Sequence, residues 1–140
     1  MIITLDTSFL ILHYFSKQPD VLKKSKAVLH HCKMARNGGI IPSVVLAESY
    51  AIARRKAGRE VAEQRFKELV DSGLKVVPLS QDMARESGVI RAKYQEKIPW
   101  GDCFIAGTHI LERADLVLSE DPHFKQIREL RANKLAEFRF

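Results

Sequence analysis

The sequence has little of the residues that define several large protein classes. It contains only 2 Cys, 5 Pro and 7 Gly in 140 residues. So little Pro and Gly excludes a fibrous or low-complexity chain, and 46% hydrophobic with 29% charged residues is typical of a globular protein. No internal repeat is present. We expect one domain over residues 1–140, which on folding removes roughly 70% of the unfolded chain's accessible surface.

Long hydrophobic runs are also missing. The longest, such as residues 44–47 and 103–106, fall far short of the ~20 apolar residues that a membrane span requires. The first residues lack the basic flank and the long apolar segment of a signal peptide. We therefore expect no membrane contact, no secretion and a cytoplasmic location.

The two cysteines, Cys32 and Cys103, are far apart, and each lies in an apolar helical pattern. Neither a disulfide framework nor a cysteine metal site is indicated, so we expect reduced, buried thiols. His30 and His31 point in different directions on a helix and have no third ligand, which excludes a zinc site built on them. His109 lies on an apolar helix and is expected to belong to the core or to an interface.

The charge of the chain favours an anionic partner. Lys and Arg number 23 against 17 Asp and Glu, a net charge of +6, and nucleic acid is the first candidate. Two basic clusters can contact RNA phosphates or can simply be solvated helix faces. The clusters are Arg54, Arg55 and Lys56, and Arg91, Lys93 and Lys97.

Short apolar stretches alternate with helical patterns along the chain. Strands are expected at residues 2–6, 40–41, 74–78 and 116–119, and a weakly alternating one at 136–140. Helices are expected at residues 7–17, 20–36, 43–56, 59–72, 80–96 and 102–111, and a short one from 122. Asp20, Ser43 and Ser80 are expected helix caps, and Gly38-Gly39 the stop of the second helix. This order predicts an α/β fold with a parallel sheet.

Four acids stand out in this arrangement. Ligands of an open parallel sheet collect beyond the carboxyl ends of its strands, where Asp6 and Asp121 follow the first and fourth expected strands. Asp102 begins an apolar helix. Each of these three is either a ligand or a helix cap, because Asp is a favoured cap. Glu48 has no such alternative, since its helical neighbours three and four positions away are all apolar.

Convergence of these acids would require a cation. A buried ionised carboxylate is costly without a partner, and two carboxylates ~4 Å apart repel by about 4 kcal/mol at an effective dielectric of 20. Oxygen-only ligation selects Mg²⁺ or Mn²⁺. Such an ion lowers the pKa of a water nucleophile and neutralises charge on a phosphate, which is the chemistry of phosphodiester hydrolysis.

Four separated segments resemble the PIN-domain ribonucleases, especially the VapC-like toxins of toxin–antitoxin pairs, across essentially the whole chain. They are residues 5–9, 43–48, 102–106 and 119–124, or Leu-Asp-Thr-Ser-Phe, Ser-Val-Val-Leu-Ala-Glu, Asp-Cys-Phe-Ile-Ala and Ser-Glu-Asp-Pro-His-Phe. The resemblance implies a PIN-like three-layer sandwich and a Mg²⁺- or Mn²⁺-dependent endoribonuclease. It also implies an RNA substrate, a small antitoxin partner and a homodimer.

The resemblance assigns four catalytic, metal-binding acids and two neighbouring hydroxyls to particular positions: Asp6, Glu48, Asp102 and Asp121, and Ser8 and Ser119. Ser119 stands where the family usually has Thr, and Glu120 adds an acid beside Asp121. Either of these two acids can face the metal. Ser8 can hydrogen-bond a metal ligand or serve as an ordinary helix-start residue.

Other functions are compatible with part of the same sequence. A PIN nuclease of housekeeping RNA processing, or a non-catalytic nucleic-acid-binding module, would suit the same charge, although Glu48 argues against the second. A phosphatase with a carboxylate nucleophile lacks its second acid in the Asp6 loop. His123 is expected to be a solvated loop residue. Trp100 either packs at a helix start or stacks on a base, with packing favoured.

Overall fold

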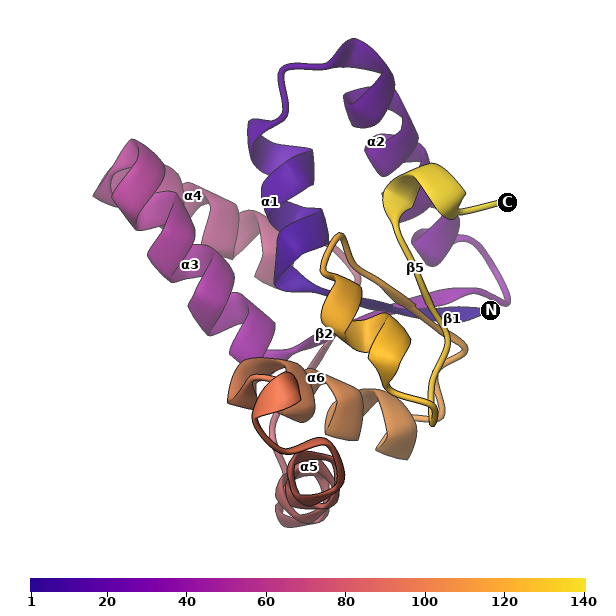
Figure 1. Cartoon of the computed structure of the whole chain (residues 1–140). Helices are drawn as coiled ribbons and strands as arrows, with labels where there is room; N and C mark the ends of the chain where they lie inside the picture. Colours follow the sequence, from indigo (N-terminus) through magenta and orange to yellow (C-terminus); the bar gives the residue numbers. More distant parts are fainter.

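A five-stranded parallel sheet lies at the centre of the protein, whose computed structural model describes residues 1–140 (Figure 1). Its strand order is β3-β2-β1-β4-β5, and every neighbouring pair is parallel. The strands are β1 (Ile2–Leu5), β2 (Gly38–Pro42), β3 (Lys75–Val77), β4 (Leu116–Leu118) and β5 (Ala132–Asn133). The predicted parallel α/β sheet is therefore confirmed.

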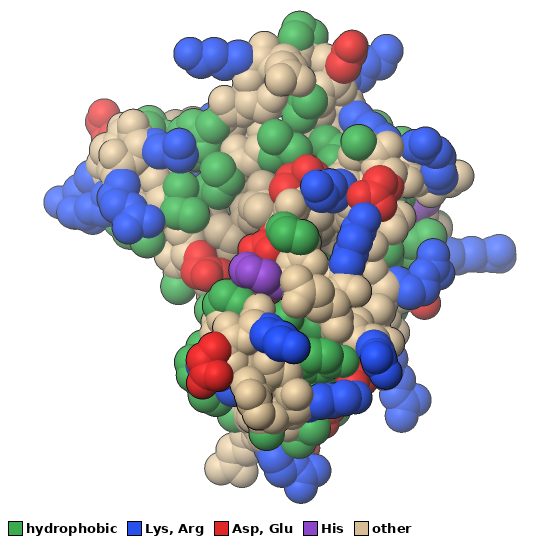
Figure 2. All heavy atoms as spheres, viewed as in Figure 1, with side chains coloured by type: hydrophobic (Ala, Val, Ile, Leu, Met, Phe, Trp, Pro, Cys, Tyr) green, Lys and Arg blue, Asp and Glu red, His purple; other side chains and the backbone are tan.

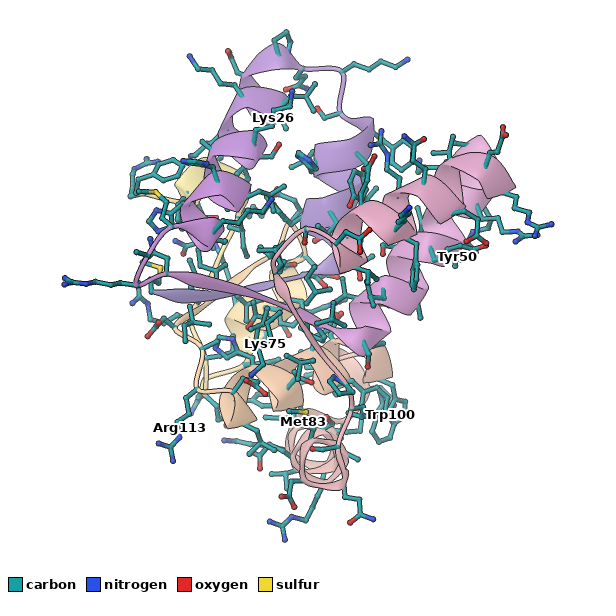
Figure 3. The ribbon with its side chains drawn as sticks, turned by 180° about the vertical axis from the view of Figure 1, so that it is seen from behind. Lys26, Tyr50, Lys75, Met83, Trp100 and Arg113 are labelled. Carbon is teal, nitrogen blue, oxygen red and sulfur yellow. The ribbon has the colours of Figure 1, made fainter.

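Helices cover both faces of the sheet. They are α1 (Thr7–Phe15), α2 (Pro19–Lys33), α3 (Ser43–Ala57), α4 (Arg59–Val70), α5 (Gln81–Tyr94) and α6 (Trp100–Leu111), with short 3₁₀ turns η1 (Gln95–Lys97), η2 (Pro122–Gln126) and η3 (Leu135–Glu137). In Figure 1, α1 and α2 lie above the sheet and α5 and α6 below it. Figure 3 shows the same layers from behind, with Lys26 on α2 and Met83 on α5 at opposite ends. The predicted three-layer sandwich is confirmed. No helix is long and apolar enough to cross a bilayer.

The central strands are buried on both faces, as expected for parallel strands between two helical layers. Ile3 and Leu5 of β1 and Val117 and Leu118 of β4 have no exposed surface. Phe9 of α1, also fully buried, belongs to the same core of 22 residues. This core holds the carboxyl ends of β1 and β4 rigidly in place.

The register of β1 and β4 brings distant parts of the chain together at one sheet edge. Leu5 pairs with Leu118, so the residues that follow, Asp6 and Ser119, leave the sheet side by side. The Asp6 N–H donates to the Leu118 carbonyl at 3.1 Å. The carboxyl edge of the sheet therefore carries the first and fourth acid segments together.

The predicted strand at residues 136–140 is wrong. The last strand is Ala132–Asn133, which pairs with Val117 and Leu118. Leu135 and Phe138, both buried, are three residues apart, which is the spacing of the 3₁₀ turn formed by η3 and not the period of two of a strand. The Leu135 N–H donates to the Glu120 carboxylate at 2.8 Å and is thus removed from any sheet ladder.

Local signals at the helix ends gave mixed results. Ser80 caps α5 as predicted, since its hydroxyl accepts from the Met83 N–H at 3.1 Å. Asp20 and Ser43 are not caps, because α2 and α3 begin after Gln18 and Pro42 without a side-chain cap.

The predicted helix stop at Gly38-Gly39 is also wrong. The second helix ends at Lys33, and both glycines lie in β2. A Cβ on Gly39 would lie 2.7 Å from a Leu74 side-chain carbon and 2.9 Å from the Cys32 Cβ. The missing side chain at Gly39 therefore lets α2 and the segment before β3 pack closely against β2.

Candidate functional site

A hollow of about 530 Å³ opens at the carboxyl edge of the sheet, between α1 and α3. Its floor carries acids from four separate parts of the chain, and its walls are formed by α1 and α3 residues. The lining residues are Asp6, Thr7, Ser8, Ile11, Leu12, Phe15, Ser16, Glu48, Ile52, Asp102, Glu120 and Asp121. All four acids predicted from the sequence are thus brought together, as a parallel sheet with ligands at its carboxyl edge requires.

Asp6 is held by two serine hydroxyls. Ser8 Oγ and Ser119 Oγ each donate to Asp6 Oδ2 at 2.6 Å, and the two hydroxyl oxygens lie 3.1 Å apart. The same hydroxyls accept the N–H groups of Glu120 and Asp121, each at 2.9 Å. Ser8 therefore contacts a predicted ligand, and the pair of serines ties Asp6 to the loop that carries the fourth acid.

Glu48 reaches the hollow from α3, and Thr7 and Gly101 contact its two carboxylate oxygens. Thr7 Oγ1 donates to Glu48 Oε1 at 2.8 Å. Gly101 packs against the other oxygen, because a Cβ on Gly101 would lie 3.0 Å from Glu48 Oε2. Burial raises the pKa of Glu48, the Thr7 hydrogen bond opposes that rise, and the charge of Asp6 adds to it. The site thus holds Glu48 where its charge is disfavoured.

Asp102 and Asp121 meet at a histidine. His123 Nδ1 lies 2.9 Å from Asp102 Oδ2 and 2.8 Å from Asp121 Oδ1. Burial raises the pKa of Asp102 to about 6, with the charges of Asp6 and Asp121 adding to the rise and the His123 hydrogen bond opposing it. Although burial acts to lower the pKa of His123, the two carboxylates raise it above its usual value.

The structure shows which of the four acids cap a helix and which do not. Asp6 and Asp121 cap α1 and η2, accepting from the N–H groups of Ser8 at 3.3 Å and His123 at 2.9 Å. Asp102 is not a cap, because α6 starts after Pro99 without a side-chain cap and Asp102 lies inside the first turn. Capping therefore explains two of the acids in part, and Asp102 and Glu48 not at all.

The donor set fits a hard divalent cation. In each of the four carboxylates one oxygen is held by the protein and the other has no protein hydrogen bond. None of the free oxygens is sealed from solvent without a partner. Lys and Arg form ion pairs with other acids only. Carboxylate oxygens that face a hollow without a cationic side chain are the groups Mg²⁺ and Mn²⁺ bind.

A family model for the PIN domain matches residues 3–130. The chain belongs to the PIN domain family. No curated protein sequence matches it. The resemblance seen in four short segments of the sequence therefore extends over most of the chain.

Solved structures share this PIN fold over nearly their full length. VapBC2 of Rickettsia felis, solved bound to a promoter DNA fragment, gives a TM-score of 0.76 at 21% identity, over 96% of this chain and 98% of the other. VapBC-1 of nontypeable Haemophilus influenzae gives 0.76 at 17%, over 98% and 100%. VapC20 of Mycobacterium tuberculosis, a sarcin–ricin loop cleaving toxin, gives 0.73 at 15%, over 92% and 98%. At these identities the likeness shows the fold.

The choice between Glu120 and Asp121 has a structural basis in this PIN domain. Both line the hollow. Glu120 Oε1 accepts the Leu135 N–H at 2.8 Å, so this side chain fastens the segment after β5. Asp121 and Asp102 both contact the His123 ring, and the three residues have donor atoms within 4.8 Å of one another. Asp121 is therefore the better candidate for the fourth ligand.

The two predicted basic clusters differ in how free they are. Arg55 and Lys97 are exposed and have no partner within the protein, and Arg54 contacts only the Tyr50 hydroxyl, at 3.0 Å. Lys56 lies 6.0 Å from the ring centre of Phe15, a wall residue of the hollow. Arg91 and Lys93 are engaged elsewhere, Arg91 with the Ile98 carbonyl and Lys93 with Glu129.

Trp100 packs at the start of α6, as expected. Its ring stacks on Phe104 with centroids 5.7 Å apart, and the Arg91 guanidinium lies 5.0 Å from its centre. Figure 3 places Trp100 at the end of the lower helical layer. Arg91 therefore braces the turn before Asp102.

Three residues that contribute to the site are not predicted by the sequence. His123, expected to be a solvated loop residue, is half-buried and bonded to two of the acids. Its position two residues after Asp121 was the only signal. Thr7 and Gly101 also contact Glu48. Their places in the sequence do not indicate these contacts, because α1 and α6 approach α3 only in the folded PIN domain.

Proposed function

We propose that this PIN domain is an endoribonuclease that hydrolyses RNA phosphodiester bonds in a reaction that depends on Mg²⁺ or Mn²⁺. The observation that supports the proposal most is the convergence of Asp6, Glu48, Asp102 and Asp121 in one hollow without a Lys or Arg partner. Carboxylates that only capped helices would not need to share a buried floor. A non-catalytic binding module gives no account of Glu48 and Asp102, whose pKa values are raised by burial.

The proposed roles follow from the contacts. The four acids would hold divalent metal, which when bound would lower the pKa of a water nucleophile and offset charge on the scissile phosphate. Ser8 and Ser119 fix one oxygen of Asp6 and leave the other without a protein hydrogen bond. Thr7 does the same for Glu48. Each hydroxyl thereby orients a ligand, which is the usual function of groups behind a metal site.

The substrate is proposed to be RNA held by its backbone. Arg54, Arg55, Lys56 and Lys97 are exposed cations. Figure 2 shows Lys and Arg side chains at the edge of the face in view and also beside the acids near its centre. Cations at the rim can bind flanking phosphates while the acidic centre requires a metal ion before a phosphate can approach.

The biological role proposed is that of a type II toxin. Structures with this fold include VapBC complexes and a toxin–antitoxin complex of Klebsiella pneumoniae, the latter at a TM-score of 0.68, 23% identity and 96% and 98% coverage. We propose a small antitoxin as partner and a homodimer as the working assembly. A housekeeping RNA-processing nuclease would use the same chemistry but would not arrest growth on its own.

The direct test is a cleavage assay on a circular single-stranded RNA, which only an endonuclease can open. The parent protein should cut it with Mg²⁺ or Mn²⁺ and stop with EDTA. Ca²⁺ should not restore cleavage, since it accepts looser geometry with more ligands. Asp102→Asn should lower the rate at least 100-fold, and Asp82→Asn, an exposed acid on α5, should not. Undiminished cutting in EDTA, or by Asp102→Asn, would contradict the proposed chemistry.

The toxin role has a separate test. Induced expression of the parent should arrest growth of a bacterial host, and Asp102→Asn at equal protein level should not. Growth unaffected by a protein that cleaves RNA in the purified state would favour a housekeeping nuclease.

A further inference from the structure

The contact of His123 with both Asp102 and Asp121 adds a nitrogen donor to a floor otherwise made of oxygen. We propose that His123 is a third protein ligand of one divalent ion, together with Asp102 and Asp121, and that the site therefore prefers Mn²⁺ to Mg²⁺. This inference rests on the proposed function, since it concerns the same metal site.

The spacing of the donor atoms supports a shared ion. His123 Nδ1 lies 2.9 Å from Asp102 Oδ2 and 2.8 Å from Asp121 Oδ1, and the three donor atoms lie within 4.8 Å of one another. Neighbouring ligands of an octahedral ion with bonds of about 2.1 Å are about 3 Å apart. A cation among the three atoms would thus replace the imidazole hydrogen that the two carboxylates share.

The ring is held in this position by its own backbone. The His123 N–H donates to Asp121 Oδ1 at 2.9 Å, the oxygen that also contacts the ring. The next residue, Phe124, is fully buried in the core and fixes η2 against the sheet. The imidazole therefore does not need to move far to ligate, and little conformational entropy is lost when it does.

The chemistry of the donors sets the preference. Mg²⁺ is a hard ion that favours oxygen ligands and keeps several waters, whereas Mn²⁺ is a softer transition-metal ion that accepts an imidazole nitrogen more readily. Two carboxylates and one imidazole therefore favour Mn²⁺ over Mg²⁺ more than four carboxylates would. Loss of His123 should remove this preference without removing the site.

Pulsed electron paramagnetic resonance of the Mn²⁺-loaded protein tests the inference. A directly bound imidazole gives ¹⁴N modulation of the Mn²⁺ signal, which should be present in the parent and should change when only histidine is labelled with ¹⁵N. This measurement needs no variant. His123→Gln should lose the modulation, and His30→Gln, an exposed histidine on α2, should keep it.

Equilibrium dialysis provides the second readout. His123→Gln should weaken Mn²⁺ binding about 10-fold or more and Mg²⁺ binding less than about 3-fold, since an imidazole contributes more to the affinity of Mn²⁺. Parent protein that binds Mn²⁺ without nitrogen modulation, or a variant that weakens both ions equally, would overturn the inference while RNA cleavage stands. Protein that binds neither ion would overturn the proposed function as well.

Discussion

Asp102 is the residue at which burial and charge conflict most clearly. Its pKa rises from an ordinary value near 4 to about 6, so the folded protein holds its carboxylate at a cost above that pH. We predict that Asp102→Asn in EDTA at pH 8 is as stable as the parent or more stable. The gain in free energy of unfolding should be at most about 3 kcal/mol, which is the energy equivalent of the rise in pKa. Urea unfolding measures this.

The difference in stability between the parent and Asp102→Asn should depend on pH. Well below pH 4 the carboxyl is protonated in both folded and unfolded chains, so its charge no longer contributes to the difference in stability between parent and variant. Between pH 4 and 6 only the folded state holds this proton, so the parent should lose stability relative to Asp102→Asn as the pH rises. An Asp102→Asn protein that is less stable than the parent at pH 8 would contradict this account, and loss of a helix cap would not explain it, because Asn caps about as well as Asp.

His109 shows the opposite behaviour on the far side of the sheet. It is buried, bonded to Thr4 Oγ1 at 2.7 Å, and burial lowers its pKa to about 4, with the charge of Asp115 opposing the shift. Between pH 6.5 and 4 only the unfolded chain binds the proton, so the contribution of His109 to stability falls as the pH falls. From pH 7 to 5 the parent should lose about 2 kcal/mol more than His109→Gln. Equal losses in the two proteins would refute this assignment.

Single residues differed in how well the sequence predicted them. Asp6, Glu48, Asp102 and Asp121 were predicted because carboxylates at strand ends or on an apolar helix face are conspicuous. The environment of His123 was not, because its ring position depends on the Asp121 cap and on the buried Phe124, two contacts that no sequence pattern specifies. Whether the four acids bind metal stays a prediction.

At the scale of elements, the crossing of α5 and α6 positions Asp102, and it depends on one glycine. A Cβ on Gly107 would lie 2.3 Å from Ser87 Oγ and 2.9 Å from the Met83 carbonyl. Gly107→Ala should destabilise the protein by roughly 1–3 kcal/mol despite the higher helix propensity of Ala. Gly88→Ala, with nothing within 4 Å, should stabilise it by up to about 1 kcal/mol. Urea unfolding that moves both variants in one direction would contradict this packing.

The order of elements was largely predictable, and their ends were not. Apolar runs of three or four residues fix β1 and β4, because a strand buried on both faces can contain little else. The last strand was misplaced, since two residues carry no period and η3 follows at once. Gly38-Gly39 predicts a helix stop, and the sequence could not show otherwise, because the close packing of α2 against Gly39 exists only after folding.

At the scale of the whole molecule, a basic chain surrounds an acidic hollow. If Arg54 and Arg55 bind RNA phosphates, replacing both with Ala should weaken binding and reduce the slope of log K against log salt by about 1.4, at about 0.7 per phosphate for single strands. Base preference should change little. Filter binding in Ca²⁺, where cleavage is not expected, measures the slope.

The control variant removes the same number of positive charges from a different helix. Lys23→Ala with Lys26→Ala removes two exposed cations from α2, which lies on the other side of α1 from α3 (Figure 1). This pair should leave the salt slope close to that of the parent. A slope unchanged by the arginine substitutions, or changed equally by both pairs, would show that no specific phosphate contact is made at the end of α3.

The central claim is that the acidic hollow binds a divalent cation, and the melting temperature tests it most directly. With Mg²⁺ or Mn²⁺ at about 100 times its dissociation constant, the parent should gain about 2.7 kcal/mol and melt on the order of 5–10 °C higher than in EDTA. Asp102→Asn should lose most of this response, and Asp82→Asn should keep it. A parent whose melting temperature ignores both ions, or an Asp102→Asn protein that responds as the parent does, would contradict the account.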